Sequence, residues 1–508
     1  MVNRIWFILF ITLVFGFFTA TPIQAIDYYV SPAGSGSICS ITAPCTLNTG
    51  IGKLASVTTV YLRGGSYLQT VSLNKSGTLS GYPGETAIID GNNSLPSGSG
   101  RTYSPLVLVS GASSVLRDVT VANSRGEGIE VTGTSVQLIN VYVHHSGENG
   151  IILKSNNSVC DGCRAWSNAM SNQGGTQSGG WGTGISACRS PQHAIIRNSV
   201  AWENWGEGIS TFGADYTIME DNISYNNWSV NMYIQNVQNA LVQRNLIYST
   251  SDSPIGSAGN QNGIVEDNES PDSQYGDSAN NTYINNFVMG TKGGFVHWSS
   301  SPAMQNAIIS NNTFVNAGRG FANIDITGTS VNSVFKNNII LQTTTGTIAS
   351  IDGGITLSNN IWSKTFSGKG TTDVVGDPKL AMTGTISSGT LTGDWFKLTP
   401  ASVLALDKAS IDSNVTNDFF KNTRPIGSAP DIGGHEYSPT SPSPSTAPSA
   451  LPQKPGDANG DTKVDGIDYV VWLNHYNQAF TGPTYGDFNN NSIVDGIDYV
   501  IWITNYGK

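Results

Sequence analysis

Between residues 110 and 365 the chain repeats short segments in which apolar residues alternate with polar ones, and each segment ends at a polar, often Asn-containing turn. Examples are Leu138–Val141, Val242–Leu246 and Phe335–Ile339. Alternation with a period of two predicts short β-strands, and the segments lack the 3.6-residue spacing of an amphipathic helix. When the segments are aligned, one turn position recurs at steps of 22, 22, 37, 23, 23, 41, 26, 26 and 22 residues. The residues at this position are Asp118, Asn140, Gly162, Ser199, Asn222, Asn245, Asn286, Asn312, Asn338 and Asn360.

A second turn position follows about ten residues later, where a Gly precedes a large apolar residue. Short strands at a fixed period indicate a solenoid. We therefore expect a parallel β-helix, in which equivalent residues of successive coils lie about 4.8 Å apart. An Asn at one turn can then hydrogen bond to the next coil, and a Gly permits the backbone angles of the other turn. The pairs at this second position are Gly128-Ile129, Gly150-Ile151, Gly184-Ile185, Gly208-Ile209, Gly263-Ile264 and Gly294-Phe295.

The two ends of this region carry further signals. The segments Tyr28–Pro32, Val60–Tyr67 and Ile88–Gly91 resemble the opening of secreted proteins in the pectate-lyase-like superfamily, and Asp431–Tyr437 resembles their closing segment. The resemblance covers residues 27–437 and implies an all-β, right-handed parallel β-helix solenoid. This superfamily includes lyases, hydrolases, epimerases and non-enzymatic binding proteins, so the resemblance implies a fold and leaves the reaction open.

The remaining sequence divides by composition. Residues 1–25 join Arg4 to an apolar run and are typical of a signal peptide, which predicts a secreted or extracellular protein, with attachment to a cell surface as an option. No second apolar run is long enough to span a bilayer, so we expect no membrane span after cleavage. We expect the solenoid over 26–437, a Pro/Ser/Thr-rich linker over 438–455 and a small domain over 456–508.

The last of these parts contains a sequence that repeats after 30 positions, as Gly456–Trp472 and Gly486–Trp502. Each copy has Asp or Asn at loop positions 1, 3, 5, 9 and 12, the oxygen-donor spacing of a calcium loop. The carbonyl groups of Lys463 and Ile493 would serve position 7. We expect two calcium ions, with the ligands Asp457, Asn459, Asp461, Asp465, Asp468, Asp487, Asn489, Asn491, Asp495 and Asp498.

This C-terminal module resembles type I dockerins. Like them, it has an Asp in place of Glu at position 12 and lacks the Gly of ordinary EF-hands at position 6, where Thr462 and Ser492 stand. The resemblance implies an all-α calcium-binding dockerin-like domain whose partner is a cohesin-like domain. Because the two copies are nearly identical, we expect a pseudo-twofold surface that binds in either orientation. The positions implied to contact the partner are Gly466, Ile467, Gly496 and Ile497.

Composition and charge limit the expected partners and the expected state of the cysteines. The formal net charge is −11 and no basic patch is present, so nucleic acid is not an expected partner. Five cysteines in an exported chain make disulfides plausible, and Cys39 with Cys45 encloses a short loop and is the expected pair. The other three cysteines are Cys160, Cys163 and Cys188. They permit either a second disulfide with one thiol left over or, together with His193, a metal site.

Aromatic and ionisable residues are concentrated between two stretches where the repeat lengthens, at about 168–183 and 250–281. Loops inserted into a solenoid commonly border its binding groove. Because the faces of Trp rings bind sugar rings, we expect a carbohydrate groove here. The residues expected to bind substrate are Trp166, Trp181, Trp202, Trp205, Trp228 and Tyr233.

Two cleavage chemistries fit this region. A polysaccharide lyase needs a base, for which Lys154 with Arg189 or His144 is a candidate set, and a cation, so a further calcium within the β-helix is an option. A glycoside hydrolase needs two carboxyl groups, for which Glu203 and Glu207 are candidates. The competing hypothesis is a non-enzymatic glycan-binding or cell-surface structural protein displayed through its dockerin-like module.

The alignment also places four polar or aromatic residues in one column of the solenoid. We interpret the region as acting on an acidic polysaccharide as part of polysaccharide breakdown. The residues of that column are His144, Trp166, Glu203 and Asn226.

Overall fold

The structure is a computed structural model that divides into two compact units, Met1–Tyr437 and Ser438–Lys508. The described residues are 26–97, 104–177, 181–189, 192–256, 259–269, 274–299, 301–318, 320–439, 454–458, 463–476, 478, 480, 482–489 and 493–507. The predicted signal peptide and the predicted ligands Asn459, Asp461 and Asn491 lie outside these residues, as does the side chain of Ile467.

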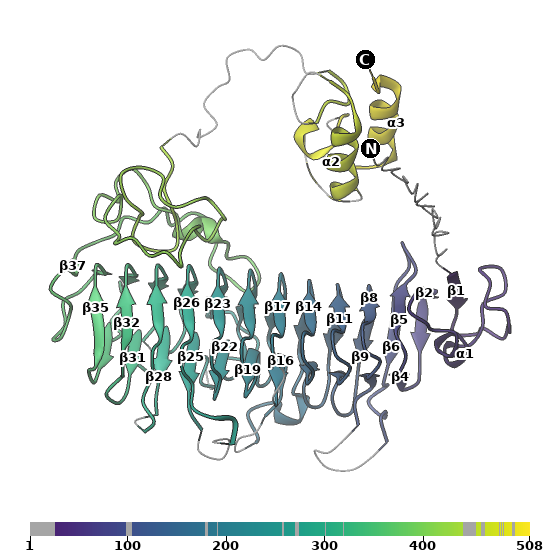
Figure 1. The fold of residues 1–508 in the computed structure, drawn as a ribbon, viewed down its shortest axis with the longest axis horizontal. Helices are drawn as coiled ribbons and strands as arrows, with labels where there is room; N and C mark the ends of the chain where they lie inside the picture. The colour runs from purple at the N-terminus through teal and green to yellow at the C-terminus, as the bar shows by residue number, and fades with distance from the viewer. Residues whose placement is uncertain are drawn as a thin grey trace, which may run out of the picture. The chain divides into compact units, whose positions relative to one another are not determined.

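The first unit is a parallel β-helix, which confirms the predicted all-β solenoid (Figure 1). Within the described residues it has two sheets of thirteen strands, sheets A and B, and one of eleven, sheet C. Sheet A contains β1 (Ile26–Val30), β2 (Thr58–Leu62), β5 (Gly77–Gly81), β8 (Ser114–Arg117), β11 (Gln137–Ile139), β14 (Val159–Asp161), β17 (Ile195–Arg197), β20 (Ile218–Glu220), β23 (Leu241–Gln243), β26 (Thr282–Ile284), β29 (Ile308–Ser310), β32 (Ser333–Lys336) and β35 (Ile355–Ser358).

Each coil contributes one strand to each sheet, in the order A, B, C along most of the chain. Sheet B contains β3 (Gly65–Tyr67), β6 (Ala87–Asp90), β9 (Thr120–Ala122), β12 (Tyr142–His144), β15 (Arg164–Trp166), β18 (Val200–Trp202), β21 (Ile223–Tyr225), β24 (Leu246–Tyr248), β27 (Phe287–Met289), β30 (Thr313–Val315), β33 (Ile339–Leu341), β36 (Ile361–Trp362) and β37 (Val374–Val375). Sheet C contains β4 (Val71–Leu73), β7 (Val107–Val109), β10 (Ile129–Val131), β13 (Ile151–Leu153), β16 (Thr183–Cys188), β19 (Glu207–Phe212), β22 (Met232–Gln235), β25 (Ile264–Asp267), β28 (Phe295–His297), β31 (Ile324–Ile326) and β34 (Ala349–Ile351).

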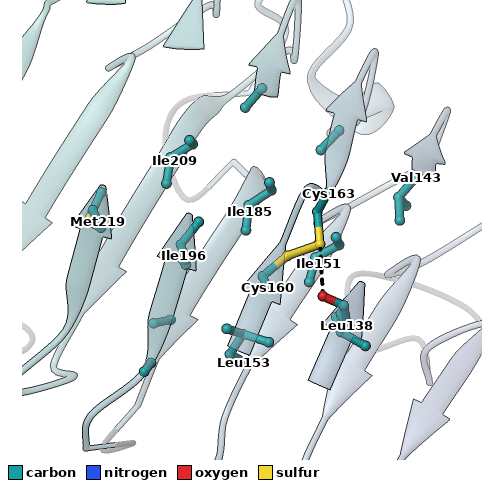
Figure 2. Packing of buried hydrophobic residues seen from close by; sticks show 14 of the residues in the cluster. Leu138, Val143, Ile151, Leu153, Cys160, Cys163, Ile185, Ile196, Ile209 and Met219 are labelled. Carbon is teal, nitrogen blue, oxygen red and sulfur yellow. Dashed lines mark hydrogen bonds between the residues drawn. A yellow bond between two sulfur atoms is a disulfide. The ribbon is translucent and has the colours of Figure 1, made fainter. Parts of the chain in front are cut away.

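Apolar side chains from all three sheets fill the interior in continuous rows. Figure 2 shows Leu138, Cys160, Ile196 and Met219 following one another along sheet A, each fully buried. Burying a side chain of this size contributes about 1.5–3 kcal/mol, so the solenoid gains stability coil by coil. Ile151, Ile185 and other residues of the Gly-aliphatic pairs form a matching row in sheet C, as the sequence predicted.

Two disulfides lie in this unit. Cys39 and Cys45, the predicted pair, are joined close to β1 and to α1 (Leu47–Gly52), which packs on β1 and β2. Cys160 and Cys163 are joined inside the core, where Figure 2 shows them between Leu138 and Ile185. Cys188 keeps a free thiol, so the cysteines follow the disulfide alternative and not the metal alternative.

A buried ladder of Asn side chains connects the later coils between sheets A and B. In each step the Nδ2 group donates to the Oδ1 atom of the next Asn at 2.9–3.1 Å, and the backbone N–H bonds to the same oxygen. The ladder ends where Asn360 donates to the carboxylate of Asp373 at 3.0 Å. Because these turns are buried, the ladder satisfies backbone groups that water cannot reach. Its members are Asn222, Asn245, Asn286, Asn312, Asn338 and Asn360.

The structure corrects the predicted column by one residue in its first three coils. Asp118, Asn140 and Gly162 align with Asn198, which adopts the left-handed conformation with φ of 51°, and not with Ser199. The true step between Gly162 and Asn198 is 36 residues. Each turn therefore has two neighbouring positions: a left-handed residue, and directly after it the residue that belongs to the ladder in later coils. In the early coils this second position is occupied by apolar residues.

The C-terminal segment of the β-helix unit, residues 376–437, packs on the outer face of the later strands of sheet B. Phe287 of β27 is stacked on Phe396 and Phe419 of this segment, with ring centroids 4.5 and 4.2 Å apart. The 3-10 turn η3 (Gly393–Phe396) contributes Phe396. Arg424 and Glu436 form an ion pair of 2.9 Å with both side chains almost fully buried. This segment covers a face that would otherwise expose large apolar side chains.

The second unit contains two helices, α2 (Gly466–His475) and α3 (Gly496–Asn505), and the 3-10 turn η4 (Pro483–Tyr485). The helices contact each other symmetrically. Trp472 Nε1 donates to the carbonyl of Asp495, and Trp502 Nε1 donates to that of Asp465, both at 2.9 Å. Among the described residues, no helix has both the length and the apolar composition needed to cross a membrane.

The ladder predicts a large difference between two Asn substitutions. Asn286→Ala removes four buried hydrogen bonds and should lower the free energy of unfolding by about 2–4 kcal/mol. Asn156→Ala removes one exposed side-chain bond, to Gln192, and should cost less than about 1 kcal/mol. Thermal or denaturant unfolding of the two variants measures this, and equal losses would contradict the role of the ladder.

Candidate functional site

A groove lies on the outer face of sheet C, over the strands from β13 to β22. In register, Ile152, Ser186, Ser210 and Tyr233 follow one another on this face. The two small Ser side chains between larger neighbours leave a hollow of about 520 Å³. The inserted segments that the sequence placed beside a groove supply its walls, including Trp181 from the first. The second contributes Asn260 and Glu269, and Trp298 lies beyond β28.

Two carboxyl groups, those of Glu207 and Glu269, line the groove and interact electrostatically. Glu207 begins β19 and interacts with the hydroxyl of Ser210, while Glu269 accepts a hydrogen bond of 2.7 Å from the hydroxyl of Tyr233. Burial, with a smaller effect from the negative charge of Glu269, raises the pKa of Glu207 to about 8. Burial and the same carboxylate hold the pKa of Tyr233 well above its usual range. At pH 7 Glu207 is therefore mainly in its neutral form, the form that can donate a proton.

A second charged group lies toward the N-terminal end of the groove. Lys154 forms an ion pair of 2.8 Å with Glu130. Burial and a hydrogen bond with Glu130 raise the pKa of Glu127 to about 7, although the positive charge of Lys154 opposes the shift. Arg189 lies close enough to Glu130 to stabilise its charge. This end of the groove thus combines two cations with acidic neighbours.

A second Asn ladder, not predicted from the sequence, fixes the turn that precedes Glu207. Asn168 donates to Asn204 at 3.0 Å, Asn204 donates to Asn227 at 2.8 Å, and Asn227 donates to Asn231 at 3.0 Å. At Gly206 a Cβ atom would lie 1.8 Å from the carbonyl oxygen of Gly182, so a larger residue cannot replace it without moving the neighbouring coil. The position of Glu207 is therefore set by buried contacts on both sides of the turn.

The structure brings part of the predicted site together and separates the rest. Of the predicted residues, five line the groove: Lys154, Arg189, Glu207, Trp181 and Tyr233. Trp205 and Trp228 contact each other at the turn before sheet C, with ring centroids 5.8 Å apart. Glu203 accepts a hydrogen bond of 2.9 Å from Ser388 in the segment that covers sheet B, so Glu203 and Glu207 do not line the same cavity.

The remaining predicted residues form an aromatic stack on the outer face of sheet B. The rings of His144, Trp166, Trp202, Tyr225 and Tyr248 follow one another, with centroids 4.5, 4.8, 6.1 and 4.8 Å apart. Neighbouring rings cover one another's faces, and sugars bind to such faces. We therefore do not include this stack in the candidate groove.

The stack also corrects the predicted column of His144, Trp166, Glu203 and Asn226. In the observed register Trp166 pairs with Trp202, and Trp202 pairs with Tyr225. Glu203 and Asn226 each lie one residue later, where both adopt the left-handed conformation. The alignment followed the polar residues and missed the aromatic row beside them.

Among the carboxyl and Trp side chains that line the groove, four were not selected from the sequence as site residues, namely Glu127, Glu148, Glu269 and Trp298. For Glu269 the available signal was the acidic run Glu266–Glu269 within the predicted inserted segment. Glu266 and Asp267 of that run are fully buried, so composition could not show which carboxyl group reaches the surface.

The second unit holds the predicted calcium loops. In the first loop the carboxylate of Asp468 accepts from the N–H groups of Ala458 and Asp465, both at 2.8 Å. In the second, Asp498 accepts equivalently from Phe488 and Asp495, at 2.7 and 2.9 Å. The carboxylates of positions 1 and 12 are buried in both loops. Carboxylates are the ligands that a hard divalent cation such as calcium prefers, and calcium binding by these loops stays a prediction.

The structure does not test the further calcium considered for the β-helix. Among the described residues of the whole chain, no three His, Cys, Asp or Glu side chains are grouped as metal ligands.

Comparison with known proteins supports the fold of the first unit. A family model described as the Pel9A-like, right-handed β-helix region matches residues 28–241, and one described as a right-handed β-helix region matches residues 171–314. No curated protein sequence matches the chain.

Two solved structures resemble the chain over most of its length. The crystal structure of pectate lyase Pel9A has a TM-score of 0.50 and 18% identity, and the match covers 82% of this chain and 98% of that one. The XylC complex with xylose has a TM-score of 0.55 and 9% identity, over 81% of this chain and 98% of the other. At these identities the likeness concerns the fold. The first unit is therefore a right-handed parallel β-helix.

Proposed function

We propose that the β-helix unit is a secreted glycoside hydrolase that cleaves a polysaccharide in the groove on sheet C. The observation that carries this proposal is the pair of carboxyl groups on Glu207 and Glu269, which line the same groove close enough for the charge of Glu269 to raise the pKa of Glu207. Hydrolysis of a glycosidic bond requires such a pair. The carbohydrate-active relatives in structure, a pectate lyase and a protein bound to xylose, support a sugar ligand.

In this mechanism Glu207 is the general acid. Its carboxyl proton passes to the oxygen of the departing sugar as the bond to the anomeric carbon breaks. Glu269, held by the Tyr233 hydroxyl at 2.7 Å, acts on the anomeric carbon directly or through a water molecule. Trp181 and Trp298 border the same cavity and present aromatic surface to the sugar rings.

The charge of the groove favours a chain without carboxylates. Besides the neutral Glu207, the carboxyl groups of Glu127, Glu148 and Glu269 line it, while the described lining has two cations, and one of these, Lys154, is already paired with Glu130. A polyuronate would bring further negative charge beside these carboxyl groups. The sequence suggested an acidic polysaccharide, whereas the charge of the groove favours a neutral one.

A lyase remains the second candidate, because Lys154 and Arg189 both line the groove and the chain matches a Pel9A-like family model. Its base would have to be a residue other than Glu207. The third candidate is a non-enzymatic glycan-binding protein. The following experiment distinguishes it from the two enzymes, because it would show no cleavage.

Glu207→Gln should reduce cleavage of a soluble glycan about 10²- to 10⁴-fold, because the amide cannot donate the proton. Glu203→Gln is the matched control, since Glu203 contacts Ser388 outside the groove, and it should retain activity close to that of the wild type. Release of reducing ends is the readout. Retained activity in Glu207→Gln, with loss in Lys154→Ala, would favour the lyase instead.

The pH dependence of stability tests the state of Glu207 without an activity assay. The folded state binds its proton more tightly than the unfolded chain, whose Glu pKa is about 4.3. The stabilising contribution is therefore complete below that value and is lost as pH rises through about 8. The Glu207→Gln variant should gain stability relative to the wild type over this window in thermal unfolding. Parallel stability profiles would show that Glu207 is not held neutral.

We further propose that the second unit is a calcium-loaded dockerin-like module that tethers the enzyme to a cohesin-like domain. The repeated loops, their buried carboxylates and the symmetric contacts of Trp472 and Trp502 support this. Gly466 and Gly496 begin the two helices, and Ile497 next to the second is 58% exposed, as a partner-binding residue would be.

Calorimetric titration of the chelated full-length protein should give two calcium ions per chain. Asp498→Ala should reduce this to one, because it removes the position-12 ligand of the second loop only. A third site would indicate the further calcium considered for the β-helix. Unchanged stoichiometry in Asp498→Ala would show that this loop does not bind the ion.

A further inference from the structure

A second concave surface lies on the outer face of sheet A, near the N-terminal end of the solenoid. Tyr29, Tyr61, Ser80 and Arg117 follow one another in register on this face. Ser80 is the small member of the row, and its position beside Tyr61 leaves a notch. The resulting cavity has a volume of about 790 Å³. Its lining residues belong to sheet A and the turn after β5, so it shares no residue with the groove on sheet C.

Aromatic rings form two walls of this notch. Tyr29 is stacked on one face of Tyr61, with ring centroids 5.6 Å apart. Tyr82 is perpendicular to Tyr61, with centroids 5.9 Å apart and planes at 83°. The guanidinium of Arg63 lies over the Tyr82 ring at 4.8 Å and holds Glu85 through hydrogen bonds of 2.6 and 2.9 Å. The turn that carries Tyr82 is thus fixed before any ligand binds, which lowers the entropic cost of binding.

The rest of the lining is polar but has no excess charge. Thr59, Thr78 and Gln137 present hydroxyl and amide groups on the same face. Arg117 forms an ion pair of 2.7 Å with Asp118, and Glu85 is paired with Arg63, so the charges cancel in pairs. Hydroxyl and amide groups beside aromatic walls match the hydroxyl groups and apolar faces of sugar rings, and a cavity of this volume can take a short stretch of a chain.

We propose that this surface is an accessory binding site for an uncharged polysaccharide, separate from the site of cleavage. A sugar ring would lie above Ser80 against Tyr61 and Tyr82, with its hydroxyl groups bonded to Thr59, Thr78 and Gln137. Because it lies on a different sheet, the site can hold one part of a polymer while another part occupies the groove on sheet C. The binding function does not depend on whether the groove is hydrolytic.

Affinity electrophoresis of the full-length protein in gels containing arabinoxylan, galactomannan or mixed-linkage glucan tests this proposal. At least one of these glycans should retard the wild type, and Tyr61→Ala should weaken its binding about tenfold, as expected for loss of one stacking ring. The matched control is Tyr142→Ala, a tyrosine 39% exposed on the outer face of sheet B, which should bind as the wild type does.

Ser80→Tyr is a second variant that keeps the Tyr29–Tyr61 contact, and it should block binding by filling the notch. Trp298→Ala changes the groove on sheet C, and this variant should still be retarded by the glycan because the notch is intact. Wild-type binding by both notch variants, or complete loss of binding in Trp298→Ala alone, would overturn the proposal. Absence of retardation of the wild type by all three glycans would overturn it as well.

Discussion

The register between coils is the constraint on which the rest of the β-helix unit depends. Parallel strands at a spacing of about 4.8 Å would leave turn backbone buried without partners unless side chains bond it from coil to coil. The Asn ladder from Asn222 to Asn360 supplies these bonds, and its last amide ends on Asp373. A slip of one residue would break every step and turn core residues outward. The ladder therefore fixes which side chains reach each outer face.

The candidate groove follows from that fixed register. The row of Ile152, Ser186, Ser210 and Tyr233 makes a hollow because two of its members are small, and the hollow lies where inserted segments add walls. Enclosure then acts on the chemistry, since burial disfavours the charged form of Glu207. A rigid solenoid with variable outward side chains can in this way carry separate sites on separate sheets, as the groove on sheet C and the notch on sheet A indicate.

Much of the fold could be predicted from the sequence because its signals repeat. The Gly-aliphatic pairs and the later Asn residues recur once per coil, and those positions face the core or the ladder. The position of the left-handed turn was harder to predict, because Asp, Asn and Gly suit both it and the neighbouring ladder position. The step after Gly162 was therefore assigned one residue too long.

The site was less predictable for a related reason. Glu203 and Glu207 are equally good carboxyl candidates by composition, but a turn separates them, and only Glu207 lines the groove. Trp166 and Trp202 suggested sugar binding, yet stacking in register covers their faces. Glu269 lies in an inserted segment that does not follow the repeat, so the repeat could not predict its position. Outward-facing residues are not restrained by the core, so their roles depend on neighbours one or more coils away.

The most direct test of the proposed chemistry is to identify the new chain ends that the purified protein produces from neutral glycans and polyuronates. The hydrolase account predicts new reducing ends from a neutral glycan without the ultraviolet absorbance of unsaturated uronates. Reducing ends accompanied by that absorbance would show elimination and contradict the assigned roles of Glu207 and Glu269. No products from either class of glycan would contradict a catalytic role for the groove.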